Sequence, residues 1–207
     1  MSLNEITKIT TEMHKTSLRL FALLENLLEW SRTQTGRIEF NPQMVDLHYI
    51  VMNKFNLYQI SASKKNIRLV SDVQPDTYLC ADIHMLKTIL RNLLNNAVKF
   101  IPEDQSKDNT ITISSREAGE FLEISVTDTG IGISDVDIGK LFRIDVSHIS
   151  INNTTEKGTG LGLILCKEFT NIHGGEIICE SKSGVGTSFR FTLPRSHEYY
   201  QKVLTGK

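Results

Sequence analysis

The amino-acid sequence predicts an α+β fold in which a sheet carries helices on one face, preceded by one long N-terminal helix. Apolar residues near the N-terminus recur every three or four positions, which is the spacing of a helix. The rest of the chain groups short segments with the two-residue alternation of strands and longer segments with helical spacing. Of its 207 residues 40% are hydrophobic, enough for the core of one ordinary domain plus an appendage.

Residues 1–40 are expected to form the long helix. One apolar seam, with alternating spacings of three and four residues, contains Ile6, Ile9, Met13, Thr16, Leu20, Leu23, Leu27 and Trp30. A second row through Phe21, Leu24 and Leu28 makes the apolar surface too wide for a two-stranded coil, and Gly36 is a plausible end. We expect self-association or an antiparallel helix from outside this chain, as in a helical bundle; packing on the chain's own domain is the alternative.

Residues 41–196 are expected to form a second domain, which begins after Asn41-Pro42. Asp46 and Asp82 directly precede helical patterns and are suited to cap two helices. The helices are expected over residues 47–62, 83–99 and 161–173. The strands are expected over residues 67–73, 77–80, 110–115, 121–127, 176–180 and 187–193.

Three connecting segments also have expected structures. Gly119 lies between two of the predicted strands and indicates a hairpin. Residues 132–158 are polar and without periodicity, which predicts a mobile loop. The last residues, 197–207, are expected to be an unpacked tail.

The composition disfavours several classes of protein. A net charge of −1 and a pI near 6.6 do not indicate binding to nucleic acid or to an anionic membrane. No segment approaches 20 apolar residues and no signal peptide opens the chain, so this segment is expected in the cytoplasm, with a membrane anchor upstream in the full-length protein left open. Cys80, Cys166 and Cys179 lie far apart, which argues against a disulfide framework and a zinc site.

The helix predicted over residues 83–99 presents three polar side chains on one face. Asn92, Asn96 and Lys99 are spaced by four and three residues. The amide oxygen of Asn96 is a suitable ligand for Mg²⁺, and the ammonium of Lys99 can neutralise a phosphate. An ordinary polar helix face is the alternative interpretation.

The segment Asp128-Thr129-Gly130-Ile131-Gly132 places a carboxylate at the end of a strand, followed by two glycines. A buried aspartate there can accept a hydrogen bond from the exocyclic amine of adenine, a donor that guanine lacks at the equivalent position. A plain turn after a strand would use the same residues.

Two further glycine-rich segments are candidates for a nucleotide site. Gly158-Thr159-Gly160-Leu161-Gly162-Leu163 offers three glycines where a helix begins, so backbone N–H groups and the positive end of the helix dipole can face a phosphate. Gly184-Val185-Gly186-Thr187 is the second, for which a tight hairpin is an equally good interpretation.

In this order, the segments resemble the motifs of sensor histidine kinases, whose ATP-binding domain has the GHKL, or Bergerat, fold. The matching motifs are the N box at Arg91–Phe100, the G1 box at Asp128–Gly132, a shortened F box at Leu141–Arg143, the G2 box at Gly158–Leu163, and the closing segments His173–Gly175 and Gly184–Phe189. The resemblance covers about residues 46–194 and implies a two-layer α/β sandwich with a mixed sheet. The helix around Ser17–Arg32 resembles the second helix of the family's dimerisation and phosphotransfer bundle.

The resemblance implies a site for ATP and Mg²⁺ between the helix over residues 83–99 and the long loop. Asp128 would contact adenine and Asn96 would ligate Mg²⁺, with Asn92, Asn96 and Lys99 as the catalytic residues. The other implied nucleotide contacts are Phe100, Gly130, Gly132, Ile133, Lys157, Gly158, Thr159, Gly160, Leu161, Gly162 and Thr187.

The resemblance also implies a phosphoacceptor histidine on a helix that this chain does not contain, because His14 lacks the family's sequence context. The phosphate would then pass to an aspartate of a response-regulator receiver domain, and the full-length protein would be a homodimer. Asn92 stands where ATP-hydrolysing relatives carry a glutamate, which disfavours hydrolysis. The alternative is a non-catalytic nucleotide-binding or dimerisation module that regulates a partner, which the short F box and Ile101 in place of a small hydroxyl residue keep open.

Overall fold

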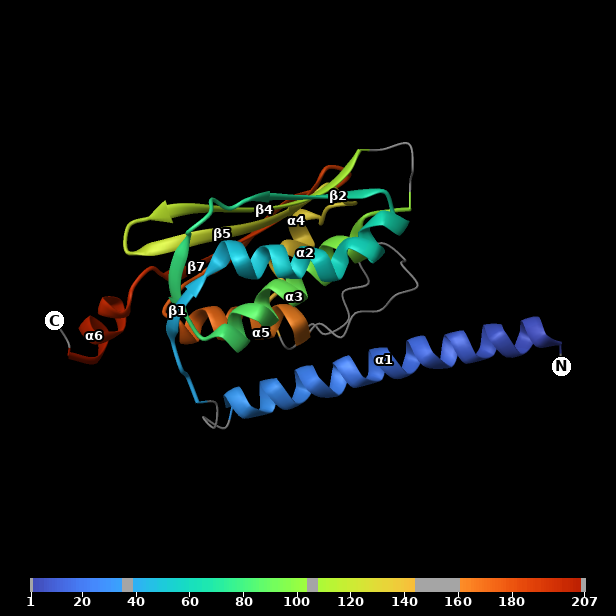
Figure 1. Ribbon diagram of the computed structural model, residues 1–207, viewed down its shortest axis with the longest axis horizontal. Coiled ribbons are helices and arrows are strands. Elements are labelled where there is room, and N and C mark those ends of the chain that lie inside the picture. The colour runs from blue at the N-terminus through green and yellow to red at the C-terminus, as the bar shows by residue number, and fades with distance from the viewer. Residues whose placement is uncertain (1, 35–38, 104–107, 144–160, 206–207) are drawn as a thin grey trace. The chain divides into compact units, whose positions relative to one another are not determined.

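A computed structural model describes residues 2–34, 39–103, 108–143 and 161–205, in two compact units, Met1–Glu39 and Phe40–Lys207 (Figure 1). The first unit is the single helix α1 (Leu3–Gln34). Ser2 and Glu5 form a reciprocal capping box at its start: the Glu5 N–H donates to Ser2 Oγ at 3.3 Å and the Ser2 N–H to Glu5 Oε2 at 2.8 Å. Its predicted end at Gly36 lies outside the described residues.

The apolar seam of α1 is exposed in the single chain. Exposed members are Ile6, Ile9, Met13, Leu20, Phe21, Leu23, Leu24, Leu27 and Leu28. Helical packing normally covers such a continuous row of large apolar side chains. The predicted long helix is confirmed. Most of its apolar surface is exposed and is available for packing against other helices.

The second unit is built on a five-stranded mixed sheet. Its strand order is β2 (Ile67–Asp72), β4 (Asn109–Ala118), β5 (Phe121–Asp128), β7 (Gly186–Pro194) and β6 (Ile177–Lys182). The β2–β4 pair is parallel and the other pairs are antiparallel, including the predicted β4–β5 hairpin. Helices α2 (Leu47–Lys64), α3 (Ile83–Phe100) and α5 (Leu161–Ile172) lie together on one face of this sheet (Figure 1). The predicted two-layer α+β fold is thus confirmed.

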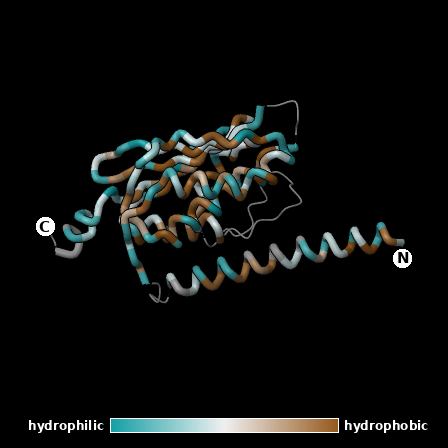
Figure 2. Tube along the Cα trace, in the orientation of Figure 1, coloured by the Kyte–Doolittle hydropathy of each residue, from teal (hydrophilic) through white to brown (hydrophobic). Residues whose placement is uncertain are grey.

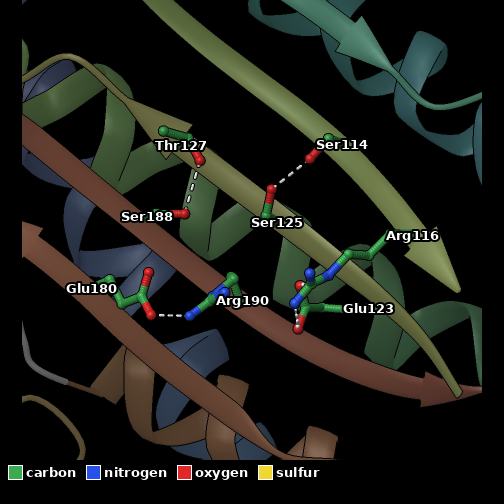
Figure 3. Close-up of polar contacts among 8 residues, drawn as sticks. All are labelled: Ser114, Arg116, Glu123, Ser125, Thr127, Glu180, Ser188 and Arg190. Atoms are coloured by element: carbon green, nitrogen blue, oxygen red, sulfur yellow. Dashed lines mark hydrogen bonds and ion pairs between the residues drawn. The ribbon is translucent and has the colours of Figure 1, made fainter. Parts of the chain in front are cut away.

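Side-chain alternation explains why the helices cover one face only. Hydrophobic and hydrophilic residues alternate along the strands (Figure 2). The buried set faces the helices and includes Ile111, Ile113, Leu122, Ile124, Val126, Phe189, Phe191 and Leu193. The opposite set is polar and is joined across strands by the pairs Ser114–Ser125, Thr127–Ser188, Arg116–Glu123 and Arg190–Glu180 (Figure 3). These pairs satisfy most polar side chains of this face, although Arg190 Nε has no hydrogen-bond partner among the described residues.

A second, two-stranded sheet joins β1 (Gln43–Asp46) to β3 (Tyr78–Ala81) in antiparallel pairing. The sequence did not predict β1. Both predicted caps are confirmed: Asp46 Oδ1 accepts the N–H of Tyr49, and Asp82 Oδ1 accepts the N–H groups of His84 and Met85.

Two of the connecting segments differ from their predictions. Within residues 132–158, the short helix α4 (Asp135–Ile138) is capped by Ser134, and residues 144–158 lie outside the described residues. The predicted unpacked tail is wrong, since helix α6 (His197–Thr205) packs through two aromatic side chains. The ring centroids of Tyr199 and Phe121 are 4.9 Å apart, and those of Tyr200 and Phe40 are 5.4 Å apart. These partners are distant in sequence, so local composition did not reveal them.

Among the described helices, none combines the length and apolar character needed to cross a membrane.

Candidate functional site

Helix α3, which carries the predicted polar triplet, is held at both ends. At its start, the Asp82 cap is fixed by His173, whose Nε2 accepts the Asp82 N–H at 2.9 Å. At its end, the ammonium of Lys65 donates to the carbonyl oxygens of Val98 and Ile101, each at 2.9 Å. A cation at a helix C-terminus satisfies carbonyls that the helix leaves unpaired. The side chains along α3 therefore project from a fixed axis.

Asp128 is the buried acid of the site. It ends β5, stands opposite Thr187 of β7, and its side chain is mostly removed from solvent. Its Oδ1 accepts the N–H of Gly130 at 2.8 Å, and the backbone of Thr187 also donates to the carboxylate. Burial outweighs these bonds and raises the pKa of Asp128 to about 6. At neutral pH the carboxylate is thus an ionised acceptor in an apolar setting.

This carboxylate lies at a small cavity of about 30 Å³. The cavity is lined by Asn96, Phe100, Asp128, Gly132, Ile133, Leu141, Leu163, Thr187 and Phe189. Apolar walls with one buried acceptor suit a flat heteroaromatic ring that carries an exocyclic amine. This space is too small for a nucleobase, so binding of a base requires these walls to move apart.

The loop after Asp128 fits its surroundings only because two positions are glycine. A Cβ on Gly130 would lie 2.6 Å from the carbonyl oxygen of Phe100, and one on Gly132 would lie 2.0 Å from that of Lys182. Gly132 also has φ +68°, which side-chain-bearing residues rarely adopt. The glycines thus let the loop pass between the end of α3 and β6.

Hydrogen bonds hold the same loop on two sides. The Ile131 N–H donates to Phe100 O at 3.1 Å, and Ile131 O accepts the N–H of Gly184 at 2.7 Å. Ser181 Oγ accepts the Ile133 N–H at 2.8 Å and lies 2.9 Å from Thr187 Oγ1. Ser181 therefore couples the two walls of the cavity, a role that no sequence motif indicated.

The three polar residues of α3 have different surroundings. Asn96 lines the cavity. Lys99 places its ammonium 5.0 Å from the ring centroid of Phe100, within cation–π range. Asn92 is buried, and its Nδ2 has no hydrogen-bond partner among the residues that the structure describes. The spacing predicted one shared face, but only Asn96 of the three lines the cavity itself.

Most of the predicted contact residues converge on this place. The structure brings together Asn96, Phe100, Asp128, Gly130, Gly132, Ile133 and Thr187, while Leu161 and Gly162 begin α5. Lys157, Gly158, Thr159 and Gly160 lie outside the described residues. The residues that sequence reasoning did not assign to the site are Ser181, Leu141, Leu163 and Phe189. Leu141 and Leu163 stand inside recognised motifs, and Phe189 occupies a core-facing position of β7, which are the signals that could have found them.

Comparison with known proteins identifies this arrangement. Residues 81–197 match the model of the family described as histidine kinase-, DNA gyrase B-, and HSP90-like ATPase. The chain belongs to this ATPase family. The matched region includes Asn92, Asn96, Asp128 and the glycine loops, and it supports nucleotide binding at the level of the family.

Within the ATPase family, the chain is similar to histidine kinases. It is 31% identical to the histidine protein kinase DivJ of Caulobacter vibrioides over 88% of this chain and 30% of that protein. It spans less than a third of the length of the relatives that it matches first, with shares of 22%, 30% and 15%. The similarity to sensor histidine kinases expected from the motifs is confirmed, while the activity of a whole kinase extends beyond this chain.

Solved structures of histidine kinases share the fold. The nucleotide-free catalytic domain of ThkA is 27% identical with a TM-score of 0.63, covering 78% of this chain and 99% of that one. Full-length ShkA in complex with AMPPNP is 26% identical with a TM-score of 0.75, covering 92% and 39% of the two chains. ThkA in complex with the response regulator TrrA, at 22% identity, TM-score 0.64 and coverage of 95% and 52%, shows the fold alone. These structures confirm the predicted GHKL architecture.

Proposed function

We propose that this chain is the cytoplasmic, catalytic part of a sensor histidine kinase, which binds Mg-ATP and transfers its γ-phosphoryl group to a histidine on another helix. The observation that carries the proposal is the buried Asp128 carboxyl group, held by the backbone of Gly130 and Thr187 at an apolar cavity. A buried acceptor of this kind is costly unless a ligand donor meets it. The exocyclic amine of adenine is that donor in the proposed complex.

The phosphates would lie along α3, beyond the base. The buried Nδ2 of Asn92 is an available donor, and Lys99 contributes positive charge. Lys157, Gly158, Thr159 and Gly160 remain proposed contacts from the sequence alone. Phosphoryl transfer depends mainly on positioning and charge stabilisation, so these residues need not include a nucleophile.

Magnesium is assigned to Asn96, whose amide oxygen is a suitable ligand and which lines the cavity. Phosphate oxygens would complete the coordination of the ion. When bound, Mg²⁺ neutralises charge on the phosphates.

The proposed acceptors are outside the ATP site. The bond from the γ-phosphorus to the bridging oxygen of ADP breaks, and a bond to a histidine nitrogen forms; the phosphoryl group then passes to an aspartate of a response-regulator receiver domain. The similarity to sensor histidine kinases supports such a partner. The exposed seam of α1, including Leu20, Leu24 and Leu27, supports a homodimeric bundle with the phosphoacceptor helix.

Calorimetry tests the ATP site. Mg-ATP is expected to bind in the micromolar range and GTP much more weakly, and chelation of Mg²⁺ should weaken ATP binding. Asp128→Asn should reduce ATP affinity about tenfold or more, because the single amide oxygen would be held by the Gly130 and Thr187 N–H groups and the NH₂ group would face the adenine amine. Asp76→Asn, in the exposed turn before β3, is the matched control. Absence of ATP binding to the unmodified chain would refute the proposal.

A transfer assay tests the kinase role. A separately supplied peptide with the family's phosphoacceptor helix should become phosphorylated at histidine by this chain and Mg-ATP, giving an acid-labile product. Acid-labile phosphate on this chain alone would contradict an external acceptor. ATP binding without transfer to any acceptor helix would instead support the non-catalytic regulatory module.

A further inference from the structure

Gly162 packs against Asn92 where α5 meets α3. A Cβ built on Gly162 would lie 3.2 Å from Oδ1 and 3.3 Å from Cγ of Asn92. These distances are shorter than ordinary van der Waals contact, so a side chain at this position would require the carboxamide of Asn92 to shift by a few tenths of an ångström. Gly162 therefore has a steric role toward one particular side chain.

Backbone freedom does not explain this glycine. Gly162 lies in the first turn of α5, and it is not among the glycines with positive φ. A helix accepts alanine more readily than glycine, so the position gives up helix stability. The absence of a side chain on Gly162 instead leaves the space that the Asn92 carboxamide occupies.

Asn92 has an unused donor in this space. The residue is only 7% exposed, and its Nδ2 makes no hydrogen bond with any residue that the structure describes. The amide interacts with the fully buried thiol of Cys166, one turn after Gly162, and sulfur is only a weak acceptor; that thiol lies 3.8 Å from the carbonyl oxygen of Ile89. Burial of an unpaired amide donor costs free energy, so its retention points to a ligand group that meets it.

We infer that Gly162 is a positioning residue for Asn92: its missing side chain lets the carboxamide lie against α5 with Nδ2 left free for a phosphate oxygen of the bound nucleotide. This inference rests on the proposed ATP site. It moves Gly162 from a direct phosphate contact, as its motif suggested, to a helix–helix contact that aims another residue.

The Asn92 side-chain amide gives a direct readout by NMR. Its ¹H–¹⁵N resonance, assigned by its loss in Asn92→Ala, should shift when Mg-ATP is added to the unmodified chain. In Gly162→Ala the same resonance should already be displaced without nucleotide, and the shift on ATP addition should shrink. Gly139→Ala is the matched control, because a Cβ on Gly139 meets nothing within 4 Å and its φ is −64°.

Affinities test the consequence for binding. Gly162→Ala should weaken Mg-ATP binding about tenfold, since the shifted carboxamide would lose its hydrogen bond to a charged phosphate oxygen, while adenosine, which has no phosphates, should bind as before. In the Asn92→Ala background, Gly162→Ala should cause no additional loss. Because alanine favours the helix, the melting temperature should not fall.

The outcomes separate this inference from the proposed function. If no resonance moves on ATP addition, the ATP site itself is refuted. If resonances of Gly130 and Thr187 move but that of Asn92 does not, ATP binding stands and the inference is overturned. Equal effects of Gly162→Ala with and without the Asn92 side chain would overturn it as well.

Discussion

His173 Nε2 accepts the backbone N–H of Asp82 at 2.9 Å, although the two residues are 91 positions apart. The other ring nitrogen, Nδ1, lies 2.6 Å from Phe169 O and carries the proton, so the imidazole is neutral and in one tautomer. Asp82 caps α3, while His173 follows the end of α5. One buried ring therefore joins the two helices that border the nucleotide site.

Replacement of His173 by alanine is expected to lower the free energy of unfolding by about 3 kcal/mol, because it leaves a cavity and an unpaired buried Asp82 N–H. Urea denaturation at pH 7 measures this loss. His84→Ala, at an exposed position of α3, is the control and should change stability by less than about 0.5 kcal/mol. Similar losses in both variants would contradict the role assigned to His173.

The same histidine should make stability fall in acid. Burial lowers the pKa of His173 below its usual 6.5, so the folded protein binds the proton less readily than the unfolded chain. Its stabilising contribution is complete above pH 6.5 and is lost as pH falls from there through the lowered pKa. The difference in unfolding free energy between the unmodified chain and His173→Ala should therefore narrow below pH 6.5. A difference that stays constant down to pH 5 would contradict this.

Asp128 should make ATP binding depend on pH in the same range. Its pKa is raised to about 6 by burial, and the proposed contact with adenine needs the ionised form. Affinity should be constant above this pH and fall about tenfold per unit below it, as for one competing proton. Titration calorimetry between pH 5 and 8 measures the profile. Asp128→Asn should bind weakly throughout and lack this step; a step of equal size in the variant would assign the titration to another group.

In the unliganded protein, Asp128 and His173 change the free energy of unfolding in opposite directions as pH falls. A carboxyl whose folded pKa is raised binds the proton more readily when folded, so it opposes folding while ionised. Protonation of Asp128 from about pH 6 downward therefore stabilises the empty site relative to neutral pH. Asp128→Asn should accordingly stabilise the unliganded chain at pH 7 while it weakens ATP binding, the exchange of stability for function expected at a binding site.

Lys65 should support α3 from its other end. Lys65→Met keeps most of the side-chain volume but removes the bonds from the ammonium to Val98 O and Ile101 O. We expect a loss of about 1–2 kcal/mol in unfolding free energy and faster amide hydrogen exchange in the last turn of α3. Lys64→Met, at the exposed neighbouring position, is the control. Unchanged exchange near Phe100 would show that the ammonium does not hold this turn.

The sequence predicted the elements whose causes are local. Asp46 and Asp82 cap helices through bonds to residues two or three positions away, and the β4–β5 hairpin needs only alternation and the turn at Gly119. Local patterns also identified Asp128 and its glycines, because a strand end followed by tightly spaced glycines is visible in the sequence.

The features that the sequence did not predict depend on distant contacts. Strand β1 has only four residues and exists because it pairs with β3, and α6 is ordered by the packing of Tyr199 and Tyr200 on distant rings. Ser181 became part of the site because the loop after Asp128 runs beside β6. The four-residue spacing of Asn92 and Asn96 predicted that both lie on one face of α3, but it did not show that their surroundings differ. Helix α5 covers Asn92 and leaves Asn96 at the cavity.

Replacement of Gly132 and of Gly184 by alanine separates two costs. At Gly184 alanine causes backbone strain alone, and at Gly132 it causes the same strain together with a steric clash. Both have positive φ, +68° and +77°, so alanine at either position costs about 1–2 kcal/mol. A Cβ on Gly184 meets no atom within 4 Å, whereas one on Gly132 would lie 2.0 Å from Lys182 O, which β6 holds in place. Gly132→Ala should therefore lose about 3 kcal/mol or more in urea denaturation and bind no ATP. Gly184→Ala should lose only the strain energy and keep most of its ATP affinity. Equal losses would show that the loop after Asp128 can move away from β6, and that the cavity wall is less fixed than its hydrogen bonds indicate.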